Sequence, residues 1–154
     1  MPDSSHLELA RSLARTPELW ERFVDFDATS RYYHRLLARP DREAWLLTWL
    51  PGQGTDWHDH GASAGAFVVL GGTLREQVAR EDRAGVLRPG ADLRWGAGRS
   101  RAFGTDHVHR VTNPTLEPAI SLHVYGPRLT VMNHYSESGT ELVRSDRRLA
   151  GADW

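Results

Sequence analysis

The sequence predicts a mainly β domain, built as a sandwich or a small barrel, with helices in front of it. After about residue 31, short segments rich in β-branched and aromatic residues alternate with glycine and proline turns, which is typical of such folds. Before about residue 28, apolar residues recur instead at helical spacing. The 154 residues are enough for one sizeable core, so we expect a single domain over residues 1–154.

The helical part is expected over residues 4–28 and contains two helices. Ser5 and Glu8 fit a capping box at the start of the first helix, and apolar residues follow on one face. Thr16 has the character of an N-cap for the second helix, with Pro17 at its first position. Large apolar residues that follow Pro17 give this second helix an apolar face.

The barrel is expected over residues 31–143. Gly71 and Gly72 separate two of its strands and predict a hairpin, because adjacent glycines readily adopt the backbone angles of tight turns. Residues 144–154 are polar, and we expect them to form a loosely held tail. The expected strands cover residues 31–39, 43–50, 65–70, 73–79, 109–113 and 119–126.

Composition and charge exclude several classes of protein. The net charge of −1 gives no broad attraction to nucleic acid or to membranes, so neither is an expected partner. The absence of cysteine excludes disulfides, thiolate metal ligands and a cysteine nucleophile, and it fits a cytoplasmic protein. The first ten residues lack the pattern of a secretion signal, and no apolar run could span a bilayer. We expect a monomer, with weak self-association as the alternative.

The stretch "TDWHDHG" contains the first candidate metal ligands. Strand alternation places His58 and His60 on one face, with Trp57 and Asp59 on the other. If that face points into a barrel, the two imidazoles converge on one point. A metal ion at that point could bind a nitrogen of each ring at about 2 Å, as coordination requires. The alternative is an ordinary pair of solvated surface histidines, which is common for an isolated His-x-His.

Two half-motifs together resemble the cupin family. Gly52 precedes His58 with five residues between them, His60 completes the His-x-His, and a later half contains His109 and, four positions on, Asn113. The resemblance implies a jelly-roll-like small β-barrel with metal ligands on facing strands.

The sequence departs from the usual cupin pattern in its ligands. Positions 64 and 65 are alanine and glycine, where cupins usually have an acidic ligand. This leaves three neutral histidines, His58, His60 and His109. Such a site keeps the whole 2+ charge of a metal uncompensated and suits an anionic bidentate ligand together with a small molecule such as dioxygen. Imidazole ligands suit iron, zinc, copper or nickel, so the ligand type alone does not choose among these metals.

The surrounding residues are similar to the thiol dioxygenases of the cysteine dioxygenase family, a branch of the cupins. The similarity extends from Tyr33 to Tyr135. It implies a ferrous iron held by three histidines, and a reaction that adds both atoms of dioxygen to a substrate thiolate to give a sulfinic acid. The expected partners are thus a small thiol and dioxygen. The matching residues are Trp49, His58, His60, His109, Asn113, Pro118, Ser121, His123, Tyr125 and Pro127.

The run "SLHVYG" places three polar side chains on one face of a strand. Ser121, His123 and Tyr125 alternate there with apolar residues. The residues alone favour an ordinary half-buried strand whose polar face is in solvent. The family resemblance implies instead a hydrogen-bonded relay at the iron, in which Tyr125 places a hydroxyl near the dioxygen. Mammalian relatives link this tyrosine to a cysteine; the matching position here is Gly65, so we expect Tyr125 to be unmodified.

The expected substrate-binding residues lie in "RYYHRLLARP". Tyr33 and Arg35 match the family's Tyr-x-Arg, whose arginine grips the carboxylate of cysteine, whereas Arg31 and Arg39 are expected in solvent. Relatives that prefer 3-mercaptopropionate tend to have glutamine at this place. The resemblance therefore implies an L-cysteine dioxygenase. The alternatives are a dioxygenase of 3-mercaptopropionate or another small thiol acid, and a non-catalytic metal-binding cupin.

His107 could compete as a ligand, because it shares a face with His109 by alternation. We prefer His109, whose spacing to Asn113 fits the second half-motif. Three other histidines, His6, His34 and His134, are expected on the surface or in packing. No tryptophan is assigned a catalytic role.

Overall fold

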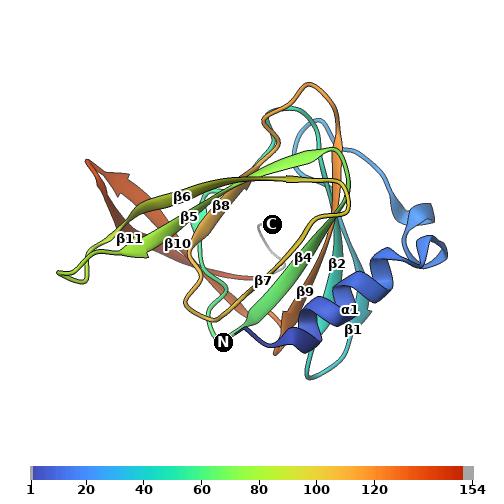
Figure 1. Cartoon of the computed structure of the whole chain (residues 1–154), viewed down its shortest axis with the longest axis horizontal. Coiled ribbons are helices and arrows are strands. Elements are labelled where there is room, and N and C mark those ends of the chain that lie inside the picture. Colours follow the sequence, from blue (N-terminus) through green and yellow to red (C-terminus); the bar gives the residue numbers. More distant parts are fainter. Residues whose placement is uncertain (1, 151–154) are drawn as a thin grey trace.

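The computed structural model describes residues 2–150 and has two antiparallel sheets that face each other (Figure 1). One sheet has the strand order β1-β2-β9-β4-β7, and the other has the order β11-β10-β3-β8-β5-β6. The mainly β fold expected from the alternating pattern is confirmed. The strands are β1 (Tyr33–Ala38), β2 (Glu43–Trp49), β3 (Trp57–His58), β4 (Ala64–Gly71), β5 (Thr73–Glu81), β6 (Leu87–Gly96), β7 (Ser100–Phe103), β8 (His109–Thr112), β9 (Ala119–Gly126), β10 (Val131–Ser138) and β11 (Glu141–Leu149).

The helix α1 (Ser4–Ala14) lies against the outer face of the five-stranded sheet (Figure 1). Its N-cap is Asp3, whose carboxylate accepts a hydrogen bond from the backbone N–H of Ser5 at 2.8 Å. The expected capping box of Ser5 and Glu8 does not form, because Asp3 already satisfies the start of the helix.

The second expected helix is replaced by two 3-10 turns, η1 (Pro17–Leu19) and η2 (Glu21–Phe23). Pro17 stands at the first position as expected. Thr16 makes no capping bond, because its hydroxyl donates back to the Ser12 carbonyl oxygen at 3.0 Å. A segment this short does not propagate an α-helix without a cap. Among residues 2–150, no helix is long and apolar enough to cross a membrane.

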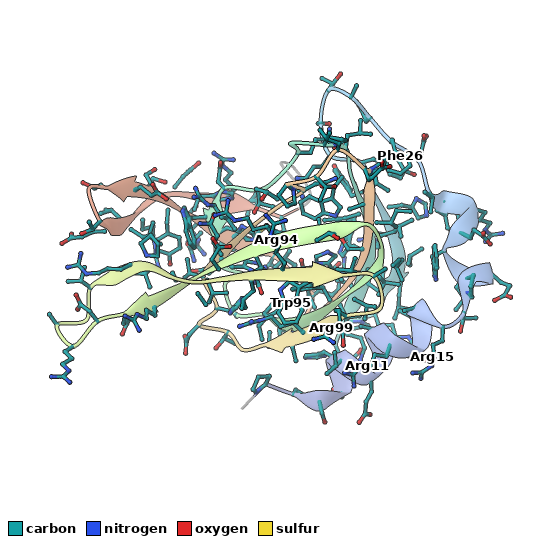
Figure 2. All side chains as sticks on the ribbon, turned by 45° about the horizontal axis from the view of Figure 1, so that its top comes forward. Arg11, Arg15, Phe26, Arg94, Trp95 and Arg99 are labelled. Atoms are coloured by element: carbon teal, nitrogen blue, oxygen red, sulfur yellow. The ribbon has the colours of Figure 1, made fainter. Side chains whose placement is uncertain are left out.

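Apolar side chains cover both faces of the five-stranded sheet, and they fill the space between the two sheets (Figure 2). This double coverage explains why all of β2 is buried, although only one face of a strand in an open two-layer fold needs to be. The layer between the sheets includes Trp45, Leu47, Trp49, Phe67, Val69, Leu74, Phe103 and Val111. The layer under α1 includes Ala10, Ala44, Ala66, Val68, Leu122 and Val124.

Gly71 and Gly72 do not form the expected hairpin. They lead the chain out of β4 in one sheet and into β5 in the other, where β5 pairs with β6 and β8. Gly72 has φ +72°, and a Cβ there would lie 2.5 Å from the carbonyl oxygen of Pro118. The glycine is thus needed for a tight crossing between sheets, not for a turn within one.

Replacing Gly72 by alanine is therefore expected to destabilise the fold, whereas the same change at Gly71 is not. At Gly72 the left-handed backbone alone costs about 1–3 kcal/mol, and the contact with Pro118 adds to it. A Cβ at Gly71 meets nothing within 4 Å, so its loss should stay within about 0.5 kcal/mol. Urea unfolding of both variants measures the difference, and equal midpoints would contradict this account of the crossing.

Residues 144–149, expected in a loose tail, instead form most of β11. This strand pairs with β10 along its whole length, from Val131 opposite Leu149 to Ser138 opposite Glu141. A polar sequence is compatible with this place because most of β11 is exposed, so the strand is held by its backbone hydrogen bonds rather than by apolar burial. The last four residues of the expected tail lie outside the described residues.

Candidate metal centre

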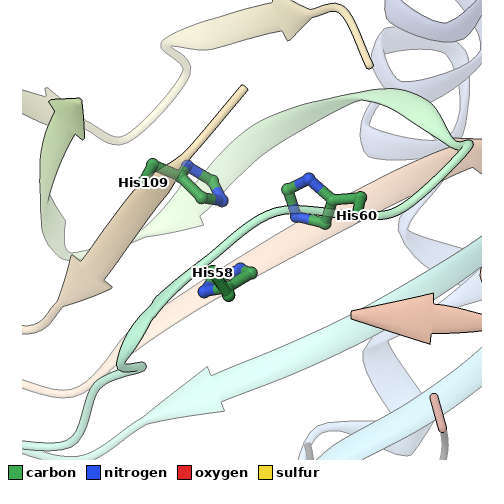
Figure 3. A group of neighbouring side chains, drawn as sticks. All are labelled: His58, His60 and His109. Carbon is green, nitrogen blue, oxygen red and sulfur yellow. The ribbon is translucent and has the colours of Figure 1, made fainter. Parts of the chain in front are cut away.

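Three histidines converge at the inner face of the six-stranded sheet (Figure 3). The two-residue strand β3 lies between β8 and β10, so that His58 stands directly opposite His109. His60 follows in the loop after β3, and its ring turns towards the other two (Figure 3). One nitrogen from each ring lies within 4.8 Å of the others, and all three residues are buried. They are therefore not an ordinary surface pair.

The nitrogen atoms of this cluster fit a metal ion. His58 Nδ1 lies 2.8 Å from the Asp56 carbonyl oxygen, and His109 Nδ1 lies 2.6 Å from Glu76 Oε2. Because both partners accept, each Nδ1 carries the proton and each Nε2 keeps its lone pair. Neither nitrogen of His60 has a hydrogen-bond partner among the described residues. A buried polar group without a partner is costly, and a divalent cation would satisfy it.

The protonation state of the cluster also fits metal binding. Burial lowers the pKa of His58 and of His60 well below the ordinary value for histidine. The neighbouring His109 lowers both further, because two imidazolium rings this close would repel each other. The two rings are thus neutral near pH 7 and offer lone pairs to a cation.

Asp59 is next to both histidines in the sequence but points away from the cluster. Its carboxylate accepts hydrogen bonds from Asn133 Nδ2 at 2.9 Å, Tyr135 Oη at 2.8 Å and the Gly61 backbone N–H at 2.9 Å. These bonds tie the loop after β3 to β10 and set the position of His60. Asp59 thus points to the side opposite His58 and His60, as strand alternation predicted.

His107 takes part in a second cluster, with Glu76 and His109. His107 Nε2 lies 2.9 Å from Glu76 Oε2, the same oxygen that His109 Nδ1 contacts. Burial alone would raise the pKa of Glu76, but the hydrogen bonds from His107 and His109 outweigh it and hold that pKa far below its usual range. Glu76 is thus a carboxylate, and His107 is bound to it rather than grouped with His58 and His60.

The strand β9 brings Ser121, His123 and Tyr125 to the inner side of its sheet, all buried. The indole N–H of Trp49 donates to Ser121 Oγ at 2.8 Å, and Ser121 Oγ lies 2.8 Å from His123 Nε2. Since an indole only donates, the serine oxygen accepts from Trp49, and the same hydroxyl is hydrogen-bonded to His123 Nε2. The polar face of β9 therefore lies inside the protein, and Trp49 orients it.

Burial also sets the proton affinities along β9. It lowers the pKa of His123 to about 3, with the nearby His109 and Arg31 acting in the same direction. It raises the pKa of Tyr125 far above its ordinary value. Around neutral pH the imidazole is therefore neutral, and the phenol keeps its proton and can donate a hydrogen bond.

The metal-free protein is expected to lose stability as the pH falls below about 6.5. The folded protein keeps His58, His60 and His123 neutral, whereas the unfolded chain protonates them near pH 6.5. The unfolded state then binds more protons, so each histidine costs about 1.4 kcal/mol per pH unit below that point. Urea unfolding with a chelator at pH 7.0, 6.0 and 5.5 measures this slope. Equal stability at pH 7.0 and 5.5 would show that these rings are not buried as neutral groups.

A cavity of about 370 Å³ opens onto the cluster. His58 and His109 line it together with His123 and Tyr125, so two of the expected ligands and two residues of the expected relay face one space. Its other lining residues include Arg31, Trp49, Gln53, Asp56, Met132, His134 and Arg148. His134 is opposite His58 in the strand pairing, with its ring centroid 6.1 Å away, and is therefore part of the cavity wall rather than a surface residue.

Arg31, expected in solvent, lines this cavity. It precedes β1, and its guanidinium lies over the Trp49 ring, 5.0 Å from the centroid. Its Nη1 is buried and has no hydrogen-bond partner among residues 2–150. Burial lowers the pKa of Arg31, and the nearby Tyr125 and Asp56 only partly offset this effect. A half-buried guanidinium with a buried, unsatisfied nitrogen fits an anionic ligand.

Arg35 does not occupy the place expected of it. The residue is exposed on β1, and its guanidinium lies 5.6 Å from the ring centroid of Trp45. It lines a separate groove, with Leu13 and Phe23 among its neighbours. Tyr33 is half-buried against Trp45 and is not among the residues that line the cavity at the cluster.

Gly65 is the direct partner of Tyr125 in the pairing of β4 with β9. A Cβ at Gly65 would lie 2.5 Å from the carbonyl oxygen of Val124 and 2.8 Å from the Phe103 ring. The backbone therefore leaves no room for a side chain, and the chain contains no cysteine. A cysteine–tyrosine link to Tyr125 cannot form within this chain.

Two facing antiparallel sheets with buried histidines on their inner side define a cupin with a candidate metal centre. The sequence matches the model of cysteine dioxygenase type I over residues 5–138. The chain belongs to this family, as its motifs suggested.

Solved structures agree with the fold. A protein called TT1209 from Thermus thermophilus is 21% identical, with a TM-score of 0.59 over 70% of this chain and 93% of that one. A protein from Klebsiella pneumoniae with a double-stranded β-helix domain is 19% identical, with a TM-score of 0.59 over 76% and 94%. A cupin 2 conserved barrel domain protein from Salinispora arenicola is 21% identical, with a TM-score of 0.51 over 70% and 83%. At these identities the likeness concerns the fold alone.

Proposed function

We propose that this protein is a non-haem iron thiol dioxygenase that oxidises L-cysteine to cysteine sulfinic acid. One observation carries the proposal: Arg31, a half-buried arginine whose buried Nη1 is unsatisfied, lines the same cavity as His58 and His109 of the three-histidine cluster. The cluster supports metal-dependent chemistry, and Arg31 supports a carboxylate on the substrate.

Family membership favours iron among the metals that imidazole ligands accept. Ferrous iron, when bound by His58, His60 and His109, would supply the redox chemistry that adds both atoms of dioxygen to the sulfur. The reaction is balanced without another reductant, because R–SH and O₂ together give R–SO₂H. Three neutral ligands leave the charge of the metal uncompensated, which favours a thiolate over a thiol.

The residues on β9 would control protons near the sulfur. Tyr125 keeps its proton, so its hydroxyl can donate a hydrogen bond to an oxygen that gains negative charge. His123, fixed by Ser121, is neutral and buried behind it. Trp49 holds Ser121 on one side and lies under Arg31 on the other, so the same indole supports the relay and the carboxylate site.

Arg31 would bind the carboxylate of the substrate while the thiolate faces the histidines. A guanidinium offers two parallel donors to a carboxylate, which fixes the direction of the substrate as well as holding it. Both L-cysteine and 3-mercaptopropionate have such a carboxylate, and only cysteine adds an amine as a further metal ligand. The second candidate function is therefore the oxidation of 3-mercaptopropionate or another small thiol acid.

An oxygen-electrode screen of the iron-loaded protein tests the proposal. We expect oxygen uptake with L-cysteine, less with 3-mercaptopropionate and mercaptosuccinate, and least with cysteamine, which has no carboxylate. A preference for 3-mercaptopropionate would change the substrate and leave the chemistry intact. Stoichiometric iron without thiol-dependent oxygen uptake would instead favour a non-catalytic metal-binding cupin.

A further inference from the structure

Glu76 lies at the centre of a group of donors that come from three strands, β6, β7 and β8, and from the loop before β8. It is fully buried on β5, between Leu74 and Val78 on the same face. An ionised carboxylate in such a place is stable only if its oxygens accept several hydrogen bonds. Glu76 has them, and one of its donors is a residue of the three-histidine cluster.

The two oxygens of Glu76 have different partners. Oε2 lies 2.6 Å from His109 Nδ1 and 2.9 Å from His107 Nε2. Oε1 accepts a hydrogen bond from the indole N–H of Trp95 at 3.1 Å, and Arg101 Nε lies 3.3 Å from it as an ion pair. Trp95, on β6, is labelled in Figure 2. One oxygen therefore faces the histidines, and the other faces the adjoining strands.

The bond to His109 is the shortest of these contacts. A carboxylate that accepts from Nδ1–H fixes the tautomer of an imidazole, directs its Nε2 and increases the basicity of that nitrogen. His58 has only a backbone carbonyl in the corresponding position, and His60 has no partner among the described residues. Of the three histidines, His109 is thus the one whose hydrogen-bond partner among the described residues is a charged carboxylate.

We propose that Glu76 is a positioning residue for the metal centre: it orients His109 and places beside it a negative charge, partly balanced by Arg101, that the three neutral ligands lack. This inference rests on the proposed metal site. The acidic residue that many cupins use as a fourth ligand is replaced, in effect, by a carboxylate one residue further from the metal. A coordination position is thereby kept for substrate while part of the metal charge is still balanced.

Cobalt(II) binding, followed by its visible absorption and by competition with a chelator, tests this role without any turnover. In Glu76→Gln the side-chain volume is kept and the charge is lost. We expect the affinity for cobalt to fall by about 10–100-fold and the absorption bands to shift. Glu76→Asp, which keeps the charge, should recover part of the affinity.

Trp95→Phe is the matched control, because it removes a donor from the opposite oxygen of the same carboxylate. A purely structural role for Glu76 predicts equal losses of metal affinity in Glu76→Gln and Trp95→Phe, which would overturn the proposal. We expect Trp95→Phe to bind cobalt within about twofold of the wild type, since its bond does not reach His109. Wild-type affinity and spectrum in a folded Glu76→Gln would overturn the proposal as well.

The wild-type protein provides a test that does not depend on folding of a variant. In the zinc-loaded, ¹⁵N-histidine-labelled protein, we expect His109 to show a protonated Nδ1 in slow exchange with water and a metal-bound Nε2. A proton on Nε2 would contradict the proposal. If the wild type binds neither zinc nor cobalt, the proposed metal site itself fails, and this outcome is distinct from failure of the role of Glu76.

Discussion

Replacement of His60 by alanine is expected to remove metal from the cluster and to abolish thiol-dependent oxygen uptake. Neither ring nitrogen of His60 is satisfied by the described residues, and a metal ion would give the nitrogen that keeps its lone pair a partner. The loss of affinity should exceed the roughly 10–100-fold that removal of an outer partner causes. Iron content after anaerobic loading, together with competition against a chelator, measures it.

His34→Ala is the control for this experiment. His34 is stacked on Phe23 with ring centroids 4.0 Å apart and does not line the cavity, so iron content should be unchanged. The same loss as in His60→Ala is expected for His58→Ala and His109→Ala. Full iron occupancy in His109→Ala would contradict the assignment and transfer the ligand role to His107, which the same carboxylate holds.

Replacement of Arg31 by glutamine is expected to lower kcat/KM for L-cysteine by about ten- to a hundredfold. Hydrogen bonds to a charged group contribute about 1.5–3 kcal/mol, and glutamine cannot reproduce the bidentate, charge-assisted pair with a carboxylate. Oxygen uptake over a range of cysteine concentrations gives the value. Activity with cysteamine, if it is turned over by the wild type, should change little, because cysteamine has no carboxylate.

Arg35→Gln distinguishes the two arginines. Arg35 is exposed and outside the cavity, so this variant should keep kcat/KM for cysteine within about twofold. The tenfold or greater loss in Arg35→Gln, with Arg31→Gln unaffected, would restore the residue that the sequence motif indicated and refute the carboxylate site at Arg31.

The three histidines were accessible to sequence reasoning because their spacing reflects the fold. His58 and His109 are opposite each other on β3 and β8, as paired half-motifs predict. His60 was placed on the correct face although β3 ends at His58 and His60 lies in a loop. The hydrogen bonds of Asp59 explain this outcome, because they hold the loop in a conformation that keeps the side chains on alternate sides.

Arg31 was expected in solvent because it lies near the end of the expected strand. Arg31, Arg35 and Arg39 were expected to share a face, but β1 covers only Tyr33–Ala38, and its pairing is irregular between Arg35 and Leu37. The segment before β1 therefore brings Arg31 into the cavity by a path that periodicity cannot give. The match of Tyr33 and Arg35 to Tyr-x-Arg did not indicate which arginine lines the cavity.

Glu76 did leave a signal in the sequence. Leu74, Glu76 and Val78 alternate on one face of β5, and a carboxylate between two apolar residues indicates a buried acid with partners.

The Gly71–Gly72 pair was misinterpreted for a different reason. The same backbone freedom serves a hairpin and a crossing between sheets, and only the long-range pairing of β5 distinguishes them.

The most direct test of the central claim is the fate of ¹⁸O₂ in a reaction of the iron-loaded protein with L-cysteine. Both oxygen atoms should enter one product, so we expect cysteine sulfinic acid about 4 Da heavier than the unlabelled compound, formed in proportion to the oxygen consumed. Cystine with hydrogen peroxide, or a sulfinic acid with one labelled atom, would contradict a dioxygenase at the three-histidine centre.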